Sequence, residues 1–299
     1  MNIAQLIQKY KGKIDRLDLE ILIAHSLGKT REFVLIHAEN SITSNQSAAI
    51  NKLVKRRIKG EPIAYLTGHK EFYGLDFIVN KHTLVPRPET EMLVELALSE
   101  ISNFKFQISN YCIVDVGTGS GCIITSIVKT LQQTVNHKLT TRNFYATDIS
   151  KEALKTAKSN AKLHGVEKKI KFLHGNLLAP LFDASCFMFH APCSMIIVAN
   201  LPYLSAEIYQ SAPIDVKKYE PKSALYSAEA GLAHYCELLT QLKTSHQSFS
   251  MFHVSCFLEI SPEQKIPLTK MIKNIFTAAE ISFEKDLAKK WRVCKIEIC

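Results

Sequence analysis

The chain has 299 residues, a formal net charge of +9 and a mean hydropathy of zero, values typical of a soluble globular protein with a sizeable core. No stretch approaches the roughly 20 apolar residues that span a bilayer. The first residues lack the basic and then apolar pattern of a signal segment, and the acidic Asp15, Asp18 and Glu20 follow too early for a transit peptide. We therefore expect a cytoplasmic protein with one large and one small domain.

The cysteines and the charge narrow the chemistry further. The eight cysteines include no Cys-x-x-Cys pair and no histidine pair at zinc-finger spacing, so we expect no metal site and reduced thiols. The positive charge is compatible with an acidic partner such as RNA or a ribosome-associated factor, and equally with lysines that are simply solvated on helix faces. We expect no stable nucleic-acid complex, no membrane association and a monomer.

Residues 1–70 predict a small helical domain. Apolar residues recur at helical spacing over residues 3–10 and form a run over residues 17–27. Ser44 is expected to cap a third helix, which ends before Pro62.

Two further regions follow along the chain. Residues 71–85 place aromatic side chains around Gly74 and predict a β-hairpin linker. From residue 86 to residue 299, apolar strand-like runs alternate with amphipathic helices, a pattern typical of an α/β fold with a doubly wound, Rossmann-like sheet. Strands are predicted at 111–116, 142–147, 169–174, 195–199, 250–260, 281–285 and 291–298. Helices are predicted at 89–101, 121–133, 151–164, 231–243 and 262–279, and the links 129–143 and 183–194 have no predicted role.

A glycine-rich loop lies between the first strand of this sheet and the following helix. Such a loop lets the backbone approach a ligand closely. A dinucleotide fingerprint would have glycine or alanine at position 122, whereas here the glycines alternate and an acid ends the strand. This spacing predicts binding of S-adenosyl-L-methionine (SAM), and hence a seven-stranded SAM-dependent methyltransferase domain. The candidate cofactor residues are Asp115, Gly117, Thr118, Gly119, Ser120 and Gly121.

The second and third strands end in further candidate cofactor residues. Asp148 stands where a doubly wound fold binds ribose hydroxyls, although it could instead form part of a helix cap with Ser150. Asn176 could bond the exocyclic amine of the adenine, and Leu177 could pack on its ring.

The fourth strand delivers Asn200-Leu-Pro-Tyr203 at its carboxyl end, where open α/β sheets bind ligands. A planar amide or aromatic amine is a poor nucleophile because its lone pair is delocalised, so a site must orient it. The Asn200 side-chain oxygen and the Leu201 carbonyl could each accept one N–H, while Pro202 fixes the turn and Tyr203 packs on the flat group. Asn200 is thereby a candidate for both the catalytic and the cofactor-binding set. The tetrapeptide alone could also be an ordinary turn at the end of a strand.

Taken together, these residues resemble the release factor glutamine methyltransferases, the PrmC or HemK family. The resemblance runs nearly end to end, and its segments at 60–68 and 84–91 are far more specific than a glycine loop. The matching segments are Gly60-Glu-Pro-Ile-Ala-Tyr-Leu-Thr-Gly68, Glu71-Phe72, Leu84-Val-Pro-Arg-Pro-Glu-Thr-Glu91, Asp115 to Gly121, Asp148, Asn200 to Tyr203, Tyr219-Glu-Pro221, Ala224-Leu225, Leu258-Glu-Ile260, Gln264, Asp286-Leu-Ala288 and Arg292-Val293.

The resemblance implies methylation of the glutamine in the Gly-Gly-Gln loop of class 1 peptide chain release factors, with SAM as the methyl donor. It implies that the helical domain binds the release factor. Residues 200–203 would hold the glutamine amide. Arg87 and Glu89 would belong to the pocket wall or contact the substrate loop, or they would cap and orient the helix that begins there.

Four positions depart from the usual pattern of this family. Leu201 stands in place of a second proline, Asn176 in place of an acid, Ser261 in place of a glycine, and Trp291 in place of an acidic or polar residue. Leu201 leaves the turn freer than proline would, although its carbonyl can still accept a hydrogen bond.

Two other functions remain open at the level of sequence. Asn-Leu-Pro-Tyr is also similar to the motif of ribosomal RNA adenine dimethyltransferases, and with the positive charge it allows an RNA adenine methyltransferase. The chain could also be a catalytically silent module that binds release factors.

Overall fold

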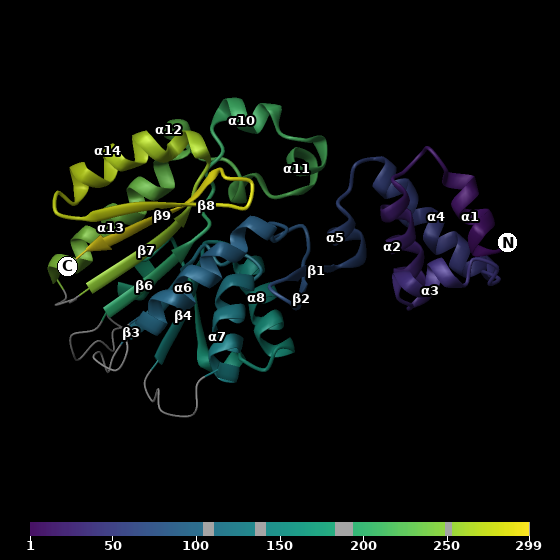
Figure 1. Cartoon of the computed structure of the whole chain (residues 1–299), viewed down its shortest axis with the longest axis horizontal. Coiled ribbons are helices and arrows are strands. Elements are labelled where there is room, and N and C mark those ends of the chain that lie inside the picture. Colours follow the sequence, from purple (N-terminus) through teal and green to yellow (C-terminus); the bar gives the residue numbers. More distant parts are fainter. Residues whose placement is uncertain (104–110, 135–141, 183–193, 249–252, 299) are drawn as a thin grey trace. The chain divides into compact units, whose positions relative to one another are not determined.

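The computed structural model describes residues 1–103, 111–134, 142–182, 194–248 and 253–298 (Figure 1). The link predicted at 183–194 lies outside these residues except for Ser194. Of the link predicted at 129–143, residues 135–141 lie outside them, whereas 129–134 continue a helix and 142–143 begin a strand. The chain forms two compact units. One comprises Met1–His69 with Pro213–Tyr219, and the other comprises Lys70–Ala212 with Glu220–Cys299. Residues 213–219, which the sequence placed in the carboxyl-terminal domain, therefore belong to the helical unit.

The first unit is helical, as expected, and contains short helices that the sequence pattern missed. Its core consists of apolar side chains that recur at helical spacing, among them Ile3, Leu6, Leu22, Ile23, Val34, Ile50 and Val54. The helices are α1 (Ile3–Tyr10), α2 (Arg16–Leu27), α3 (Arg31–Ile36), α4 (Ser44–Ile58), α5 (Ile63–Thr67) and α11 (Ile214–Tyr219).

The expected cap of α4 was wrong by one residue. Thr43 is the N-cap, because its backbone is extended and its side chain accepts a hydrogen bond from the Gln46 N–H, while the Gln46 side chain bonds back to the Thr43 N–H. Ser44 is already the first residue of the helix.

A two-stranded hairpin, β1 (His69–Phe72) and β2 (Leu75–Ile78), begins two residues earlier than predicted. Tyr73 and Gly74 form its turn with φ of 53° and 70°. Two consecutive positive φ values match the right-handed twist of the flanking strands, which explains why the turn needs only two residues.

The second unit contains a seven-stranded sheet in the order β5-β4-β3-β6-β7-β9-β8, which confirms the predicted fold class. The strands pair in parallel except β9, which is antiparallel to both β7 and β8. The strand order reverses at β3, which pairs with β4 on one side and with β6 on the other. Ligands bind at such a switch point in open α/β sheets. The strands are β3 (Tyr111–Val116), β4 (Arg142–Asp148), β5 (Ile170–His174), β6 (Ser194–Ala199), β7 (His253–Glu259), β8 (Glu280–Lys285) and β9 (Trp291–Ile298).

Helices cover both faces of this sheet (Figure 1). Alternate residues of a strand point to opposite faces, so Ile113 packs with α6 and α7, whereas Val114 and Val116 pack with α13 and α14. The helices of this unit are α6 (Glu91–Asn103), α7 (Cys122–Thr134), α8 (Lys151–Leu163), α9 (Ala179–Phe182), α10 (Ala206–Ser211), α12 (Ala228–Gly231), α13 (Ala233–Ser248) and α14 (Lys265–Ile275), with 3-10 turns η1 (Pro88–Thr90), η2 (Glu167–Lys169), η3 (Lys222–Ala224) and η4 (Pro262–Gln264). In the part of the chain that the structure describes, no helix is long and apolar enough to cross a bilayer.

Asn160 on α8 ties the hairpin to the glycine loop. Its side-chain Nδ2 donates to the carbonyls of Ile78 and Ser120, at 2.9 and 2.8 Å, and its Oδ1 accepts from the Ile78 N–H at 2.8 Å. The side chain is fully buried.

We expect Asn160→Ala to lower the free energy of unfolding by about 2–3 kcal/mol, because each buried polar group left without its partner costs about 1–3 kcal/mol. Ser159→Ala on the exposed side of the same helix is the matched control and should change it by less than about 0.5 kcal/mol. Urea unfolding of both variants measures the difference. Equal effects of the two substitutions would contradict the assigned role of Asn160.

Candidate active site

A cavity of about 280 Å³ lies in the second unit where β3, β4, β5 and β6 end. Four segments distant in sequence meet there because the carboxyl ends of neighbouring parallel strands share one edge of the sheet. The predicted site residues that line it are Arg87, Gly117, Thr118, Gly119, Ser120, Asp148, Asn176, Leu177, Asn200, Leu201 and Pro202. Glu89, Asp115, Gly121 and Tyr203 are not among its lining residues.

The three glycines of the loop have different roles, although all have φ between 57° and 77°. A Cβ on Gly117 would lie 2.8 Å from Leu201 Cδ2, and a Cβ on Gly121 would lie 2.9 Å from Ala157 Cβ. These two glycines permit close packing within the protein. At Gly119 the nearest atom would be 4.0 Å away, so this position opens onto the cavity and leaves room for a ligand against the backbone.

Asp115 binds the glycine loop from the interior of the protein. Its Oδ2 accepts hydrogen bonds from Thr118 Oγ1 at 2.6 Å and from the Ile124 N–H at 3.3 Å, while its Oδ1 has no partner among the described residues. The side chain is fully buried, and this burial raises the pKa of Asp115 to about 7. Asp115 thus holds the loop against the start of α7 and does not face the cavity.

Asp148 lines the cavity and also contacts the start of α8, as its alternative role beside Ser150 predicted. Its Oδ1 accepts from the Ser150 N–H at 2.8 Å at the start of α8, and its Oδ2 accepts from the Gly119 N–H at 2.9 Å. Burial raises the pKa of Asp148, against the effect of these two hydrogen bonds. Each carboxylate oxygen retains a lone pair for a hydroxyl donor in the cavity.

Asn176 and Leu177 lie at the end of β5 in the same cavity. Asn176 Nδ2 donates to Glu237 Oε1 on α13 at 2.5 Å, which leaves the Asn176 oxygen as the acceptor of that side chain. Leu177 is buried with φ of 51°, a conformation that costs energy outside glycine and is often found at functional sites.

Asn200 makes a contact that the sequence did not suggest. Its Nδ2 donates to Thr90 Oγ1 at 3.0 Å, and Thr90 Oγ1 donates to Glu259 Oε2 at 2.7 Å. Glu259 also accepts a hydrogen bond from the Tyr203 hydroxyl at 3.1 Å. The Tyr203 hydroxyl therefore contacts the Glu259 carboxylate, and Tyr203 does not line the cavity.

Arg87 lines the cavity and forms an ion pair with the buried Glu220, which also accepts from the Val85 N–H at 3.1 Å. This pair fixes the segment that precedes η1. Glu89 is exposed in the first turn of η1, and Arg87, the N-cap residue of this turn, makes no side-chain capping hydrogen bond. Sequence reasoning missed Thr90, Glu220 and Glu259, although each lies in a segment that carries the family resemblance.

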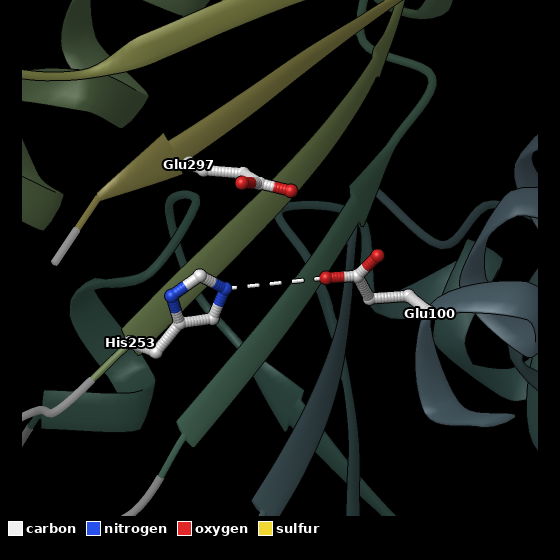
Figure 2. A group of neighbouring side chains, drawn as sticks. All are labelled: Glu100, His253 and Glu297. Carbon is white, nitrogen blue, oxygen red and sulfur yellow. Dashed lines mark ion pairs between the residues drawn. The ribbon is translucent and has the colours of Figure 1, made fainter. Parts of the chain in front are cut away.

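A second cluster of side chains lies at the other end of the strands, where β7 begins and β9 ends. Figure 2 shows Glu100, His253 and Glu297 directed toward one another, with ligand atoms within 4.8 Å, so that they could hold a metal ion. Lys295 forms ion pairs with both carboxylates. Burial alone would lower the pKa of Lys295, but hydrogen bonds to Glu297 and Glu100 raise it. The ammonium group thus already supplies the positive charge that these acids need, and we propose no metal here.

Comparison with known proteins is consistent with this geometry. The profile of the PrmC N-terminal domain matches residues 3–68, and that of a methyltransferase domain matches residues 107–196. The release factor glutamine methyltransferase of Bacillus anthracis is 32% identical over 279 residues, which cover 93% of this chain and 91% of that protein. The corresponding protein of Dictyoglomus turgidum is 34% identical over 280 residues, which cover 94% and 90%. The chain belongs to the release factor glutamine methyltransferase family.

The resemblance inferred from the sequence motifs is thus confirmed. SAM is the methyl donor of this class of domain, as predicted. Members of a second group are longer. The bifunctional methyltransferase of Rickettsia prowazekii is 33% identical over 294 residues, which cover 91% of this chain and 53% of that protein, and that of Rickettsia typhi is 35% identical with coverage of 78% and 46%. The chain spans about half the length of these relatives.

Solved structures show the same methyltransferase fold. The human METTL16 catalytic domain in complex with an RNA hairpin has a TM-score of 0.52 at 15% identity, with 85% of this chain and 81% of that one covered. The METTL16 N-terminal domain in complex with SAH has a TM-score of 0.51 at 14% identity, with coverage of 92% and 93%. At such identities the likeness concerns the fold alone.

The raised pKa of Asp115 predicts how the stability of the protein without cofactor depends on pH. A carboxyl in an unfolded chain titrates near about 3.9. An acid whose pKa is raised by folding binds more protons in the folded state, so its contribution to stability falls as pH rises from about 4 to about 7. We expect Asp115→Asn to remove this contribution, so that the Tm of the variant minus that of the parent increases from about pH 5 to about pH 8. A difference in Tm that is constant with pH would contradict this assignment.

Proposed function

We propose that the chain transfers a methyl group from S-adenosyl-L-methionine to the side-chain amide nitrogen of the glutamine in the Gly-Gly-Gln loop of class 1 peptide chain release factors. The observation that carries this proposal is the position of Asn200 and Leu201 in one cavity with the open backbone at Gly119. The family relationship supports the choice of glutamine over other planar nitrogens.

The residues of the cavity fit the cofactor. Bound SAM supplies an electrophilic methyl group on a sulfonium, which is an excellent leaving group. The backbone at Gly119 would lie against it, Asp148 would accept from the ribose hydroxyls through its remaining lone pairs, and Asn176 and Leu177 would hold the adenine.

The substrate amide is positioned by two acceptors. Asn200 Oδ1 and the Leu201 carbonyl each accept one N–H of the glutamine, which turns the face of the planar nitrogen toward the methyl group. No strong base is required, because the nitrogen becomes acidic as it is alkylated and releases its proton to water. The buried Leu201 side chain packs against Gly117, so the two halves of the site are in direct contact.

The helical unit is the proposed contact surface for the release factor. This assignment rests on the match of residues 3–68 to the PrmC N-terminal domain. Leu201 and the charge of +9 favour the second candidate, methylation of an adenine amino group in RNA. A silent binding module is the third, and the open loop backbone beside Asn200 argues for activity.

The test uses purified protein and SAM labelled on the methyl group. We expect label in a class 1 release factor and none when the glutamine of its Gly-Gly-Gln loop is replaced by alanine. Total RNA in a parallel reaction should remain unlabelled. Label in RNA alone would establish the second candidate, and label in neither substrate would favour the silent module.

A substitution tests the role of Asn200. We expect Asn200→Ala to lower kcat by roughly 100-fold, since misplacing a nucleophile affects rate more than affinity. SAM binding, measured by calorimetry, should change much less. Turnover equal to that of the parent would remove Asn200 from the mechanism.

A further inference from the structure

A chain of hydrogen bonds runs inward from the cavity through Asn200, Thr90 and Glu259. The last two side chains are 3% and 1% exposed, so water does not compete for their hydrogen bonds. The three residues come from different places in the sequence. Thr90 ends η1, Asn200 follows β6, and Glu259 ends the adjacent strand β7.

The chemistry of Glu259 sets the direction of these bonds. A carboxylate has no hydrogen to donate, so it accepts from both the Thr90 and the Tyr203 hydroxyl groups. Burial raises the pKa of Glu259, and the two hydrogen bonds and the positive charge of Arg292 offset this rise only in part. The direction of the bonds rests on the geometry, in which the Thr90 and Tyr203 hydroxyl groups each donate to one Glu259 oxygen.

The direction of the hydrogen bond between Thr90 and Glu259 determines the direction of the bond between Thr90 and Asn200. A threonine hydroxyl has one hydrogen, and at Thr90 this hydrogen is given to Glu259. Toward Asn200 the Thr90 oxygen can only accept, so it selects the NH2 end of the Asn200 amide. The oxygen end is left for the cavity, which Asn200 lines.

The opposite orientation of the Asn200 amide would prevent it from accepting a hydrogen bond from the substrate. The two ends of an asparagine amide have nearly the same shape and differ in hydrogen-bonding character. If Asn200 were rotated by half a turn, its NH2 group would face the NH2 group of the substrate, and two donors cannot bond each other. Shape alone does not prevent this rotation.

We propose that Thr90 and Glu259 are positioning residues, which fix the amide orientation of Asn200 so that its oxygen faces the nitrogen to be methylated. Neither residue touches the substrate in this role. The inference rests on the proposed function, because it concerns the same acceptor.

The backbone of Glu259 is itself held in place. The Tyr235 hydroxyl donates to the Glu259 carbonyl, and the next residue, Ile260, donates from its N–H to the Arg292 carbonyl at 2.8 Å. The backbone that carries the Glu259 carboxylate is therefore fixed, and the carboxylate can orient the Thr90 hydroxyl group.

Thr90→Val tests the proposal because it removes the hydroxyl and keeps the shape. Thr90→Ser retains the hydroxyl and is the conservative variant. Thr125→Val is the matched control, since Thr125 is fully buried in α7 and its hydroxyl finds no hydrogen-bond partner among the described residues. All three are made in the full chain. The measurements are kcat and KM for release factor, SAM affinity, Tm, and the exchange rate of the Asn200 side-chain amide protons by NMR.

For Thr90→Val we expect kcat to fall by roughly 100-fold, SAM affinity to be unchanged, and exchange of the Asn200 amide protons to accelerate. Thr90→Ser and Thr125→Val should remain within about threefold of the parent in kcat. A purely structural role would instead lower Tm and leave the kcat of the folded protein intact. If Thr90→Val does not fold, Thr90→Ala takes its place with the same expectations.

Three results would overturn the proposal: turnover by Thr90→Val within about threefold of the parent, an equal loss in Thr90→Ser, or unchanged amide exchange at Asn200. Failure of the proposed function is recognised separately, since the unmodified protein would then leave release factor unlabelled. If RNA is the substrate, the same variants are compared on RNA. If neither is methylated, amide exchange at Asn200 decides the question without turnover.

Discussion

The adjacency of β3 and β6 is the constraint on which the rest of the structure depends. Because β3 pairs with β4 on one side and with β6 on the other, the strand order reverses between them, and the loops that leave β3 and β6 open a crevice at the edge of the sheet. Gly117 and Leu201 meet in this crevice so closely that a Cβ on Gly117 would collide with the leucine side chain. The glycine loop and the turn at Asn200 are thereby brought to one cavity.

Four acids surround this crevice, three of them buried and Asp148 half-buried, and each has a different partner. Asp115 holds the glycine loop from within, Asp148 bridges that loop and α8, and Glu220 neutralises Arg87 in the cavity wall. Glu259 receives the two hydroxyl groups behind Asn200. Removing Asp115 or Glu259 would leave buried donors without partners, which costs more than the bonds themselves contribute.

The helical unit and the methyltransferase unit divide the proposed work between recognition and chemistry. The first has its own apolar core, formed by short capped helices, and matches a domain family of its own. The second has two cores, one on each face of its sheet, and it contains the cavity. Selectivity for a protein substrate would then arise from residues remote from the methyl group, as the motifs at 60–68 and 84–91 already indicated.

The sequence by itself determined the elements with strong periodicity and the loops at strand ends. All seven strands of the sheet, the glycine loop and the turn at Asn200 were predictable, because alternation and glycine spacing are local signals. Short helices such as α3 and α5 were missed, because so few residues are too short a stretch to show helical periodicity.

Only the tertiary structure decided what faces the cavity and what lies behind it. Asp115 and Gly121, predicted as cofactor residues, lie against Ile124 and Ala157, while Tyr203 contacts Glu259. Thr90, 110 residues from Asn200 and 169 from Glu259, joins them through hydrogen bonds that no local pattern specifies. The direction of a hydrogen bond depends on the partner's chemistry in space, and sequence spacing carries no record of it.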